Sequence, residues 1–213
     1  MSGAMPIHYN RFAGQDLGRI AALGDGIFAF AMTLLVLEIH IPEPADIHSE
    51  AELWAGLVAL TPGIVTWLMS VLTLGIFWIG QQTQLSHLTR ADRNLSWLYF
   101  LFLAIITALP FSTRLLAEFF TYRLAFFVYW ANILFAGLAL YGCLFYEDRA
   151  GLMREEVTAE IKRALRRRII VAQALYAVGA ALGLFDVAWG IGFIILVQLN
   201  YAIAPRLPIL YKI

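Results

Sequence analysis

Residues 18–38 read GRIAALGDGIFAFAMTLLVLE, an apolar run interrupted by Arg19, Asp25 and Thr33 and followed by Pro42. A helix that crosses the hydrocarbon core of a bilayer needs about 20 mostly apolar residues. The run is long enough for one crossing, and the proline that follows cannot continue a helix. We therefore predict a membrane-spanning helix here, with an acidic loop after it.

The composition extends this interpretation to the whole chain. Of the 213 residues, 61% are hydrophobic and 14% are charged, whereas soluble domains carry about 25% charged residues. The mean hydropathy is +0.75. Six spanning helices would take roughly 120 residues, which leaves room for short loops and for no separate soluble domain.

We expect an all-α integral membrane fold, with residues 1–213 forming a single six-helix transmembrane domain. Helix breakers and polar connectors divide the apolar sequence into segments of spanning length. The six expected spans are residues 18–38, 53–79, 95–111, 124–146, 169–185 and 187–204.

The segments between the spans carry their own signals. Pro62 is expected to kink the second span and Pro110 to end the third. Residues 81–94 are expected to be a polar connector, and Asp186 alone separates the last two spans, as in a tight helical hairpin. The charged residues 147–168 are expected to form an exposed cytoplasmic helix that continues into the fifth span.

The distribution of positive charge gives the expected orientation. Of the 15 Lys and Arg residues, all except Arg114 and Arg123 fall in the tails and alternate loops on one side of the six spans. Cytoplasmic loops carry an excess of Lys and Arg. We therefore expect a multi-pass protein of a bacterial inner membrane with both termini in the cytoplasm.

The sequence contains no residue pattern typical of an enzyme. It has no phosphate-binding loop, no His-Glu-x-x-His zinc motif and no Gly-x-Ser-x-Gly nucleophile turn. Its single Cys143 excludes an intramolecular disulfide and a Cys-rich zinc site. Lys plus Arg and Asp plus Glu both number 15, so net charge indicates no nucleic-acid partner. We expect no enzymatic activity, no metal site and no cofactor.

Two ionisable residues inside the first span are informative, because charged groups in hydrocarbon are costly and usually face other helices or water. Arg19 and Asp25 are six positions apart, which places them about 120° apart around the helix. They cannot form an i, i+4 pair. Asp25 therefore needs a partner on a neighbouring helix or subunit, while Arg19 lies close enough to the cytoplasmic surface to snorkel.

Beyond Asp25, one face of the same span carries a mostly apolar stripe with one hydroxyl in it. Its members are Ile27, Phe30, Thr33, Leu34 and Leu37. A stripe of this kind is most often ordinary helix packing. In a symmetric oligomer it would instead surround an axial pore, where rings of apolar side chains close the pathway by excluding water.

The order of these residues is itself a pattern. Arg19 to Asp25 is followed by Ala29, by Thr33 with Leu34 and Leu35, and by Pro42. This resembles the first-helix signature of the transmembrane protein 175 family of potassium channels: Arg, three residues, Phe-Ser-Asp, an Ala, a Thr-Leu-Leu stretch and a Pro. Further matches along the chain are Phe77-Trp78, Pro110-Phe111-Ser112-Thr113 and the basic start of the fifth span. The resemblance covers essentially the whole chain and fits the six-helix prokaryotic branch.

The resemblance implies a homotetramer whose first helices line a central pore, with no selectivity-filter loop. Carried over to this chain, the apolar constriction, the hydroxyl layer and a further apolar ring of the family are Phe30, Thr33 and Leu37. Ile27 and Leu34 would line the pore beside them. Arg19 and Asp25 would belong to the polar network that holds the first helix in place.

The sequence departs from the family pattern at four places. Leu23-Gly24-Asp25 replaces Phe-Ser-Asp, so the serine hydroxyl is missing. Gln81 or Gln82 stands where a His is expected, and Tyr99 aligns with an Asn. An aromatic Phe30 replaces the usual Ile or Leu at the constriction.

We therefore predict a membrane-embedded, potassium-permeable cation channel with a hydrophobic gate, whose permeant species are monovalent cations. Two alternatives stay open. One is a proton- or solute-coupled carrier that uses Asp25 as its titrating group, which broken helices near the midplane and an internal repeat would favour. The other is a non-conducting membrane protein that assembles or regulates partners through residues 147–168.

Overall fold

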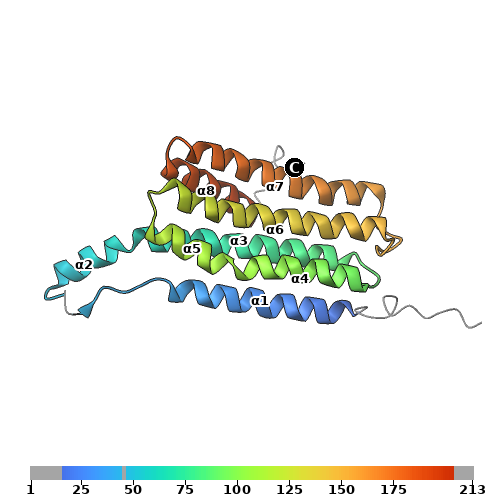
Figure 1. Cartoon of the computed structure of the whole chain (residues 1–213), viewed down its shortest axis with the longest axis horizontal. Coiled ribbons are helices and arrows are strands. Elements are labelled where there is room, and N and C mark those ends of the chain that lie inside the picture. The colour runs from blue at the N-terminus through green and yellow to red at the C-terminus, as the bar shows by residue number, and fades with distance from the viewer. Residues whose placement is uncertain (1–15, 45–46, 204–213) are drawn as a thin grey trace, which may run out of the picture.

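The computed structural model describes residues 16–44 and 47–203, and all the regular elements in that part of the chain are helices. In chain order they are α1 (Leu17–Leu37), α2 (Glu50–Ala59), α3 (Thr61–Ser86), α4 (Arg93–Thr107), α5 (Leu109–Glu118), α6 (Arg123–Arg149), α7 (Ala159–Gly183) and α8 (Val187–Ile203). The long helices run side by side, and α2 projects from one end of the bundle (Figure 1). The expected all-α fold is confirmed.

Within the described residues, four segments are long and apolar enough to cross a membrane. They are α1, α3, the pair α4 and α5 taken together over Arg93–Glu118, and α6. α8 is also apolar but has 17 residues. The chain is therefore a multi-pass membrane protein.

The second and third expected spans differ from the observed helices, and a proline accounts for each difference. The segment 53–79 is not one kinked span, because α2 ends at Ala59 and Pro62 lies in the first turn of the separate α3. Pro110 does not end the segment 95–111, because it lies in the first turn of α5, which continues to Glu118. A proline is tolerated in a first turn because its missing N–H has no helical partner there.

α3 also continues past its expected end. It runs to Ser86, through the start of the expected polar connector 81–94. The polar residues that suggested a connector lie inside the bundle instead: Gln81 is 0% exposed and Gln84 is 2% exposed. Polar side chains therefore mark the inner face of this helix as well as its end.

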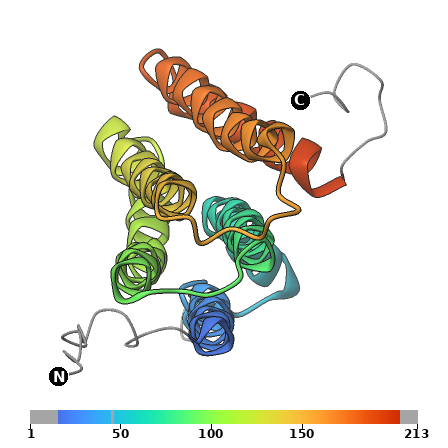
Figure 2. The same ribbon diagram turned by 90° about the vertical axis from the view of Figure 1, so that its right-hand side faces the viewer.

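α3 is the central element of the bundle. It contacts α1, α5, α6 and α8 (Figure 2). Phe102 of α4 packs against Phe28 of α1 and Phe77 of α3, with ring centroids 6.2 and 6.0 Å apart. Tilted aromatic pairs at this separation bury a large apolar area and favour a defined geometry. They join α1 to the rest of the bundle.

The last two helices form the expected hairpin, and glycines allow their close approach. A Cβ atom at Gly190 would lie 2.9 Å from the carbonyl oxygen of Gly179. A Cβ atom at Gly183 would lie 2.2 Å from the ring of Phe126 on α6. The small residues therefore serve packing, both within the hairpin and against α6.

The charged segment 147–168 is only partly an exposed connector. α6 runs through to Arg149, and Glu147 within it is 0% exposed, which corrects the expectation for that residue. Asp148 forms ion pairs with Lys162, at 2.6 Å, and with Arg166. These pairs dock the charged start of α7 against the end of α6, and α7 continues from there into the apolar sequence as expected.

Candidate functional site

The first helix has one packed face and one free face. Its packed face consists of Gly24, Phe28, Ala31 and Leu35, which recur every three or four residues as a helix requires. α1 lies at the edge of the bundle (Figure 2), and the burial of these residues shows that their face is turned inward. The side chain of Asp16 caps the start of α1 by accepting from the N–H of Gly18 at 2.9 Å. These contacts fix which residues point outward.

The predicted pore residues lie on the free face or at its border. Phe30 is 64% exposed and Leu37 is 73% exposed. Thr33 is also exposed, whereas Ile27 and Leu34 are half-buried. The Thr33 hydroxyl donates to the carbonyl oxygen of Phe30 at 2.8 Å. Because the donor is used within the helix, the lone pairs of the Thr33 oxygen remain available to a cation.

The free face also carries groups that do not belong in contact with lipid. Arg19 and Asp25 are exposed, although both lie within the apolar helix. Ionisable groups in a membrane span face a protein interior or water rather than acyl chains. Arg19 and Asp25 are thus the ionisable groups on the exposed side of α1 among the described residues.

Asp25 has two partners on a neighbouring helix, as its position in the sequence requires. Its Oδ1 atom accepts from Nε1 of Trp78 at 2.8 Å and from Nε2 of Gln82 at 2.8 Å. Both donors come from α3, one helical turn apart. The three side chains fasten α1 to α3 beside the Phe30 level, and Gln82 rather than Gln81 makes the contact.

Gln81 lies against the backbone of α1 at Gly24. A Cβ atom at Gly24 would lie 2.8 Å from Oε1 of Gln81 and 2.9 Å from its Nε2. Any side chain at position 24 would therefore displace the Gln81 amide. Within the described residues this buried amide has no hydrogen-bond partner. The absence of a side chain at Gly24 and the position of the Gln81 amide are therefore sterically linked in this structure.

Arg19 does not join the cluster around Asp25. Its backbone N–H contacts the Asp16 carboxylate at 3.3 Å, but among the residues that the structure describes its side chain has no ion-pair or hydrogen-bond partner. Arg19 and Asp25 therefore lie apart on the surface of α1, as their 120° offset around the helix predicts.

A buried polar network on the inner face of α3 has no counterpart among the residues predicted from the sequence. Ser70 contacts Thr113 at 2.7 Å, Thr73 contacts Tyr129 at 3.0 Å, and Gln198 donates to Thr73 at 2.7 Å. Nearer the other end of α3, Tyr99 donates to Glu147 at 2.7 Å. These bonds join helices that the chain places far apart in sequence. The described part of the chain has no His, Cys, Asp and Glu group suited to a metal ion.

Comparison with protein families gives a match over residues 19–110, to the family described as endosomal/lysosomal potassium channel TMEM175. A potassium channel of Streptomyces collinus is 33% identical over 167 residues, which cover 76% of this chain and 80% of that protein. The mouse endosomal/lysosomal proton channel TMEM175 is 29% identical over 112 residues, half of this chain and 22% of that protein.

A solved structure resembles the whole bundle. It is a crystal structure described as a lysosomal potassium-selective channel TMEM175 homologue from Chamaesiphon minutus. The TM-score is 0.76 at 27% sequence identity, and the match covers 90% of this chain and 98% of that one.

Proposed function

The chain belongs to the TMEM175 family of potassium channels, and on this premise we propose that it is the subunit of a homotetrameric, potassium-permeable channel whose four α1 helices surround the ion pathway. It conducts monovalent cations and carries out no enzymatic chemistry.

One observation carries this proposal: the free face of α1 combines large apolar side chains with polar and charged ones. Phe30 and Leu37 are largely exposed, and Thr33 lies between them on the same face. A lipid-facing helix has no need of Arg19 or a threonine hydroxyl on its outer side. A pore needs both kinds of residue, apolar rings that close it and oxygen atoms that a cation can contact.

Each level of the free face then has a role. Four Phe30 rings around an axis meet and exclude water, so they form the narrowest, closed level. The Thr33 oxygens, one helical turn away, contact a partly dehydrated cation. Leu37 forms a further apolar ring towards the outer end, with Ile27 and Leu34 at the borders between neighbouring α1 helices.

The arrangement of connections supports six crossings with both termini in the cytoplasm. The start of α1, the α3–α4 connection and the α6–α7 connection lie at one end of the bundle (Figure 1). Arg90, Arg93 and the charged start of α7 are at that end. Cytoplasmic segments of bacterial inner-membrane proteins are rich in Lys and Arg. The apolar part of α7 and the apolar α8 complete the six spans.

Cross-linking tests the proposed assembly. Leu37→Cys should form disulfide-linked subunits on oxidation, because Leu37 is 73% exposed and faces its own copies in the tetramer. Phe135→Cys on α6, at 57% exposed, is the matched control and should remain monomeric on a denaturing gel. The native Cys143 is 0% exposed and contributes little background.

The same sample in native mass spectrometry should have the mass of four subunits. Only monomers or dimers, or equal cross-linking at positions 37 and 135, would contradict a pore formed by α1.

Proton conduction is the second candidate function, and the animal relatives named proton channels support it. The proton- or solute-coupled carrier considered from the sequence would use Asp25 as its proton-binding group. The contacts favour a structural role for Asp25, because two N–H donors from α3 already occupy one of its oxygens.

The third alternative, a non-conducting assembly protein acting through residues 147–168, has less support. Asp148 in that segment already pairs with Lys162 and Arg166 of the same subunit.

A further inference from the structure

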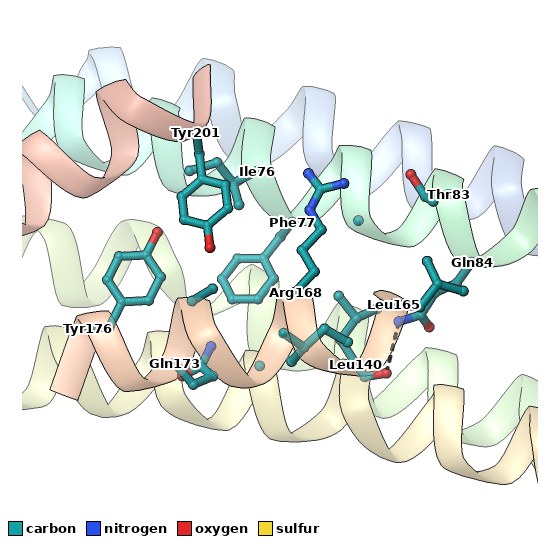
Figure 3. A pocket seen from close by; sticks show the side chains of 14 residues that line it. Ile76, Phe77, Thr83, Gln84, Leu140, Leu165, Arg168, Gln173, Tyr176 and Tyr201 are labelled. Atoms are coloured by element: carbon teal, nitrogen blue, oxygen red, sulfur yellow. Dashed lines mark hydrogen bonds between the residues drawn. The ribbon is translucent and has the colours of Figure 1, made fainter. Parts of the chain in front are cut away.

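A pocket lies between α3, α6, α7 and α8, on the side of the subunit away from α1. Its volume is about 60 Å³. Figure 3 shows Arg168 extending from α7 towards α3 across this pocket, and the hydroxyl groups of Tyr176 and Tyr201 pointing into the same space. The proposed ion pathway uses none of these residues.

The mouth of the pocket has unbalanced positive charge. The first three turns of α7 carry five basic residues, and two of these, Lys162 and Arg166, are neutralised by Asp148. Among the described residues, Arg167 and Arg168 form no ion pair. Arg168 lines the pocket and is exposed at its edge. An anion is therefore the complementary ligand.

The position of Arg168 along α7 places this charge at the membrane surface. The sequence of α7 is charged up to Arg168 and apolar from Ile169 onward. This change marks the boundary between water and hydrocarbon, which is the level of lipid phosphate groups. Basic pockets between helices on the cytoplasmic side are typical sites for anionic lipid headgroups.

The wall below Arg168 suits the rest of such a lipid. Ile169 and Ala172, which follow Arg168 on α7, provide an apolar surface next to Ile76 of α3. Gln173 lies about 7.5 Å further along α7, and its buried Oε1 has no hydrogen-bond partner within the described residues. Along α7 the site thus passes from the charged Arg168 to an apolar surface, in the order of a phospholipid's phosphate and acyl chain, with the polar Gln173 at the far end of that surface.

We propose that this pocket binds an anionic phospholipid, with its phosphate on Arg168 and the upper part of one acyl chain against the apolar wall. The cavity is too small for a whole lipid, so the remaining chain lies in the bilayer. The site rests on the orientation given under the proposed function, which puts Arg168 in the cytoplasmic leaflet. A bound lipid there would brace the α7–α8 hairpin against α3.

Lipid retention by the purified full-length protein tests the site without any flux measurement. Phosphatidylglycerol and phosphatidylcholine with the same acyl chains are titrated and adducts are counted by native mass spectrometry. Arg168→Gln should weaken phosphatidylglycerol binding by about fivefold, the effect of one surface cation. Arg163→Gln, the matched control outside the pocket, should change it less than twofold. Ala172→Phe fills the apolar part while keeping every charge, and it should also lose the lipid.

Three outcomes would overturn the proposal. Equal losses in Arg168→Gln and Arg163→Gln would mean that phosphatidylglycerol responds to net charge alone. Equal retention of phosphatidylcholine would remove the role of the anion. Displacement of the lipid by glycerol phosphate at equal concentration would identify a soluble anion as the ligand. Because ion flux is not measured, failure here leaves the channel proposal unaffected.

Discussion

Phe30→Ala should raise the resting potassium flux of the reconstituted protein by about tenfold or more. The four phenyl rings exclude water at the narrowest level, and a loss of about 1.4 kcal/mol from the barrier is a tenfold change in rate. Alanine removes most of the apolar wall, so water and ions can enter. Flux of potassium from proteoliposomes, measured at equal amounts of tetramer, gives the ratio.

Two matched variants separate the barrier from ion coordination. Val36→Ala removes apolar volume from an exposed position of the same helix, 50% exposed, but about 120° away from Phe30, and should leave the flux unchanged. Thr33→Val keeps the shape and removes the hydroxyl, so it should mainly alter the ratio of potassium to sodium flux. If Phe30→Ala leaves the potassium flux unchanged while a substitution on another helix raises it, α1 does not line the pore.

Asp25→Ala should reduce the yield and thermal stability of the tetramer. The substitution leaves the N–H groups of Trp78 and Gln82 without their acceptor, at a cost of roughly 1 kcal/mol for each of the two hydrogen bonds lost. It also releases α1 from α3 next to the constriction. The fraction of tetramer on size-exclusion chromatography and the unfolding temperature report the loss.

Asp25→Asn is the control for Asp25→Ala. Its side-chain oxygen can still accept from Trp78 and Gln82, so most of the tetramer should be recovered. A carrier that titrates Asp25 behaves differently, because asparagine cannot bind a proton and transport would stop with the tetramer intact. Unchanged assembly and flux in Asp25→Ala would mean that the carboxylate is merely solvated.

The sequence predicts the long helices well where apolar length decides them. α1 begins and ends within one residue of the expected 18–38, and α6 extends only a few residues beyond 124–146. The two prolines do not specify the helix boundaries, because Pro62 and Pro110 are each compatible with a kink, a helix end and a first turn. Only the packing around α3 decides that each begins a new helix.

Burial of polar residues was the main feature that local sequence concealed. Glu147 lies next to a charged segment, so composition assigns it to solvent. Its spacing indicates burial instead. Glu147 continues a series of buried residues on α6 that recur at intervals of three or four, namely Tyr129, Ile133, Ala136, Leu140 and Cys143. A carboxylate in register with a buried stripe therefore indicates a buried hydrogen bond, here from Tyr99.

Helical periodicity predicts which residues of the candidate site share a face of α1. That Phe30, Thr33 and Leu37 share a face, and that Asp25 needs a partner on another helix, follow from spacing alone. The identity of that partner does not, since Gln81 and Gln82 differ by one position and only the rotation of α3 against α1 selects Gln82. The steric link between Gly24 and Gln81 is equally invisible without coordinates.

Passive cation flux through the purified wild-type tetramer is the most direct test of the proposed function. Proteoliposomes loaded with potassium or sodium, without a proton gradient, should release potassium down its gradient faster than sodium, and Phe30→Ala should increase that release. Absence of flux from intact tetramers of both wild type and Phe30→Ala would contradict the account, as would potassium movement that requires a coupled proton.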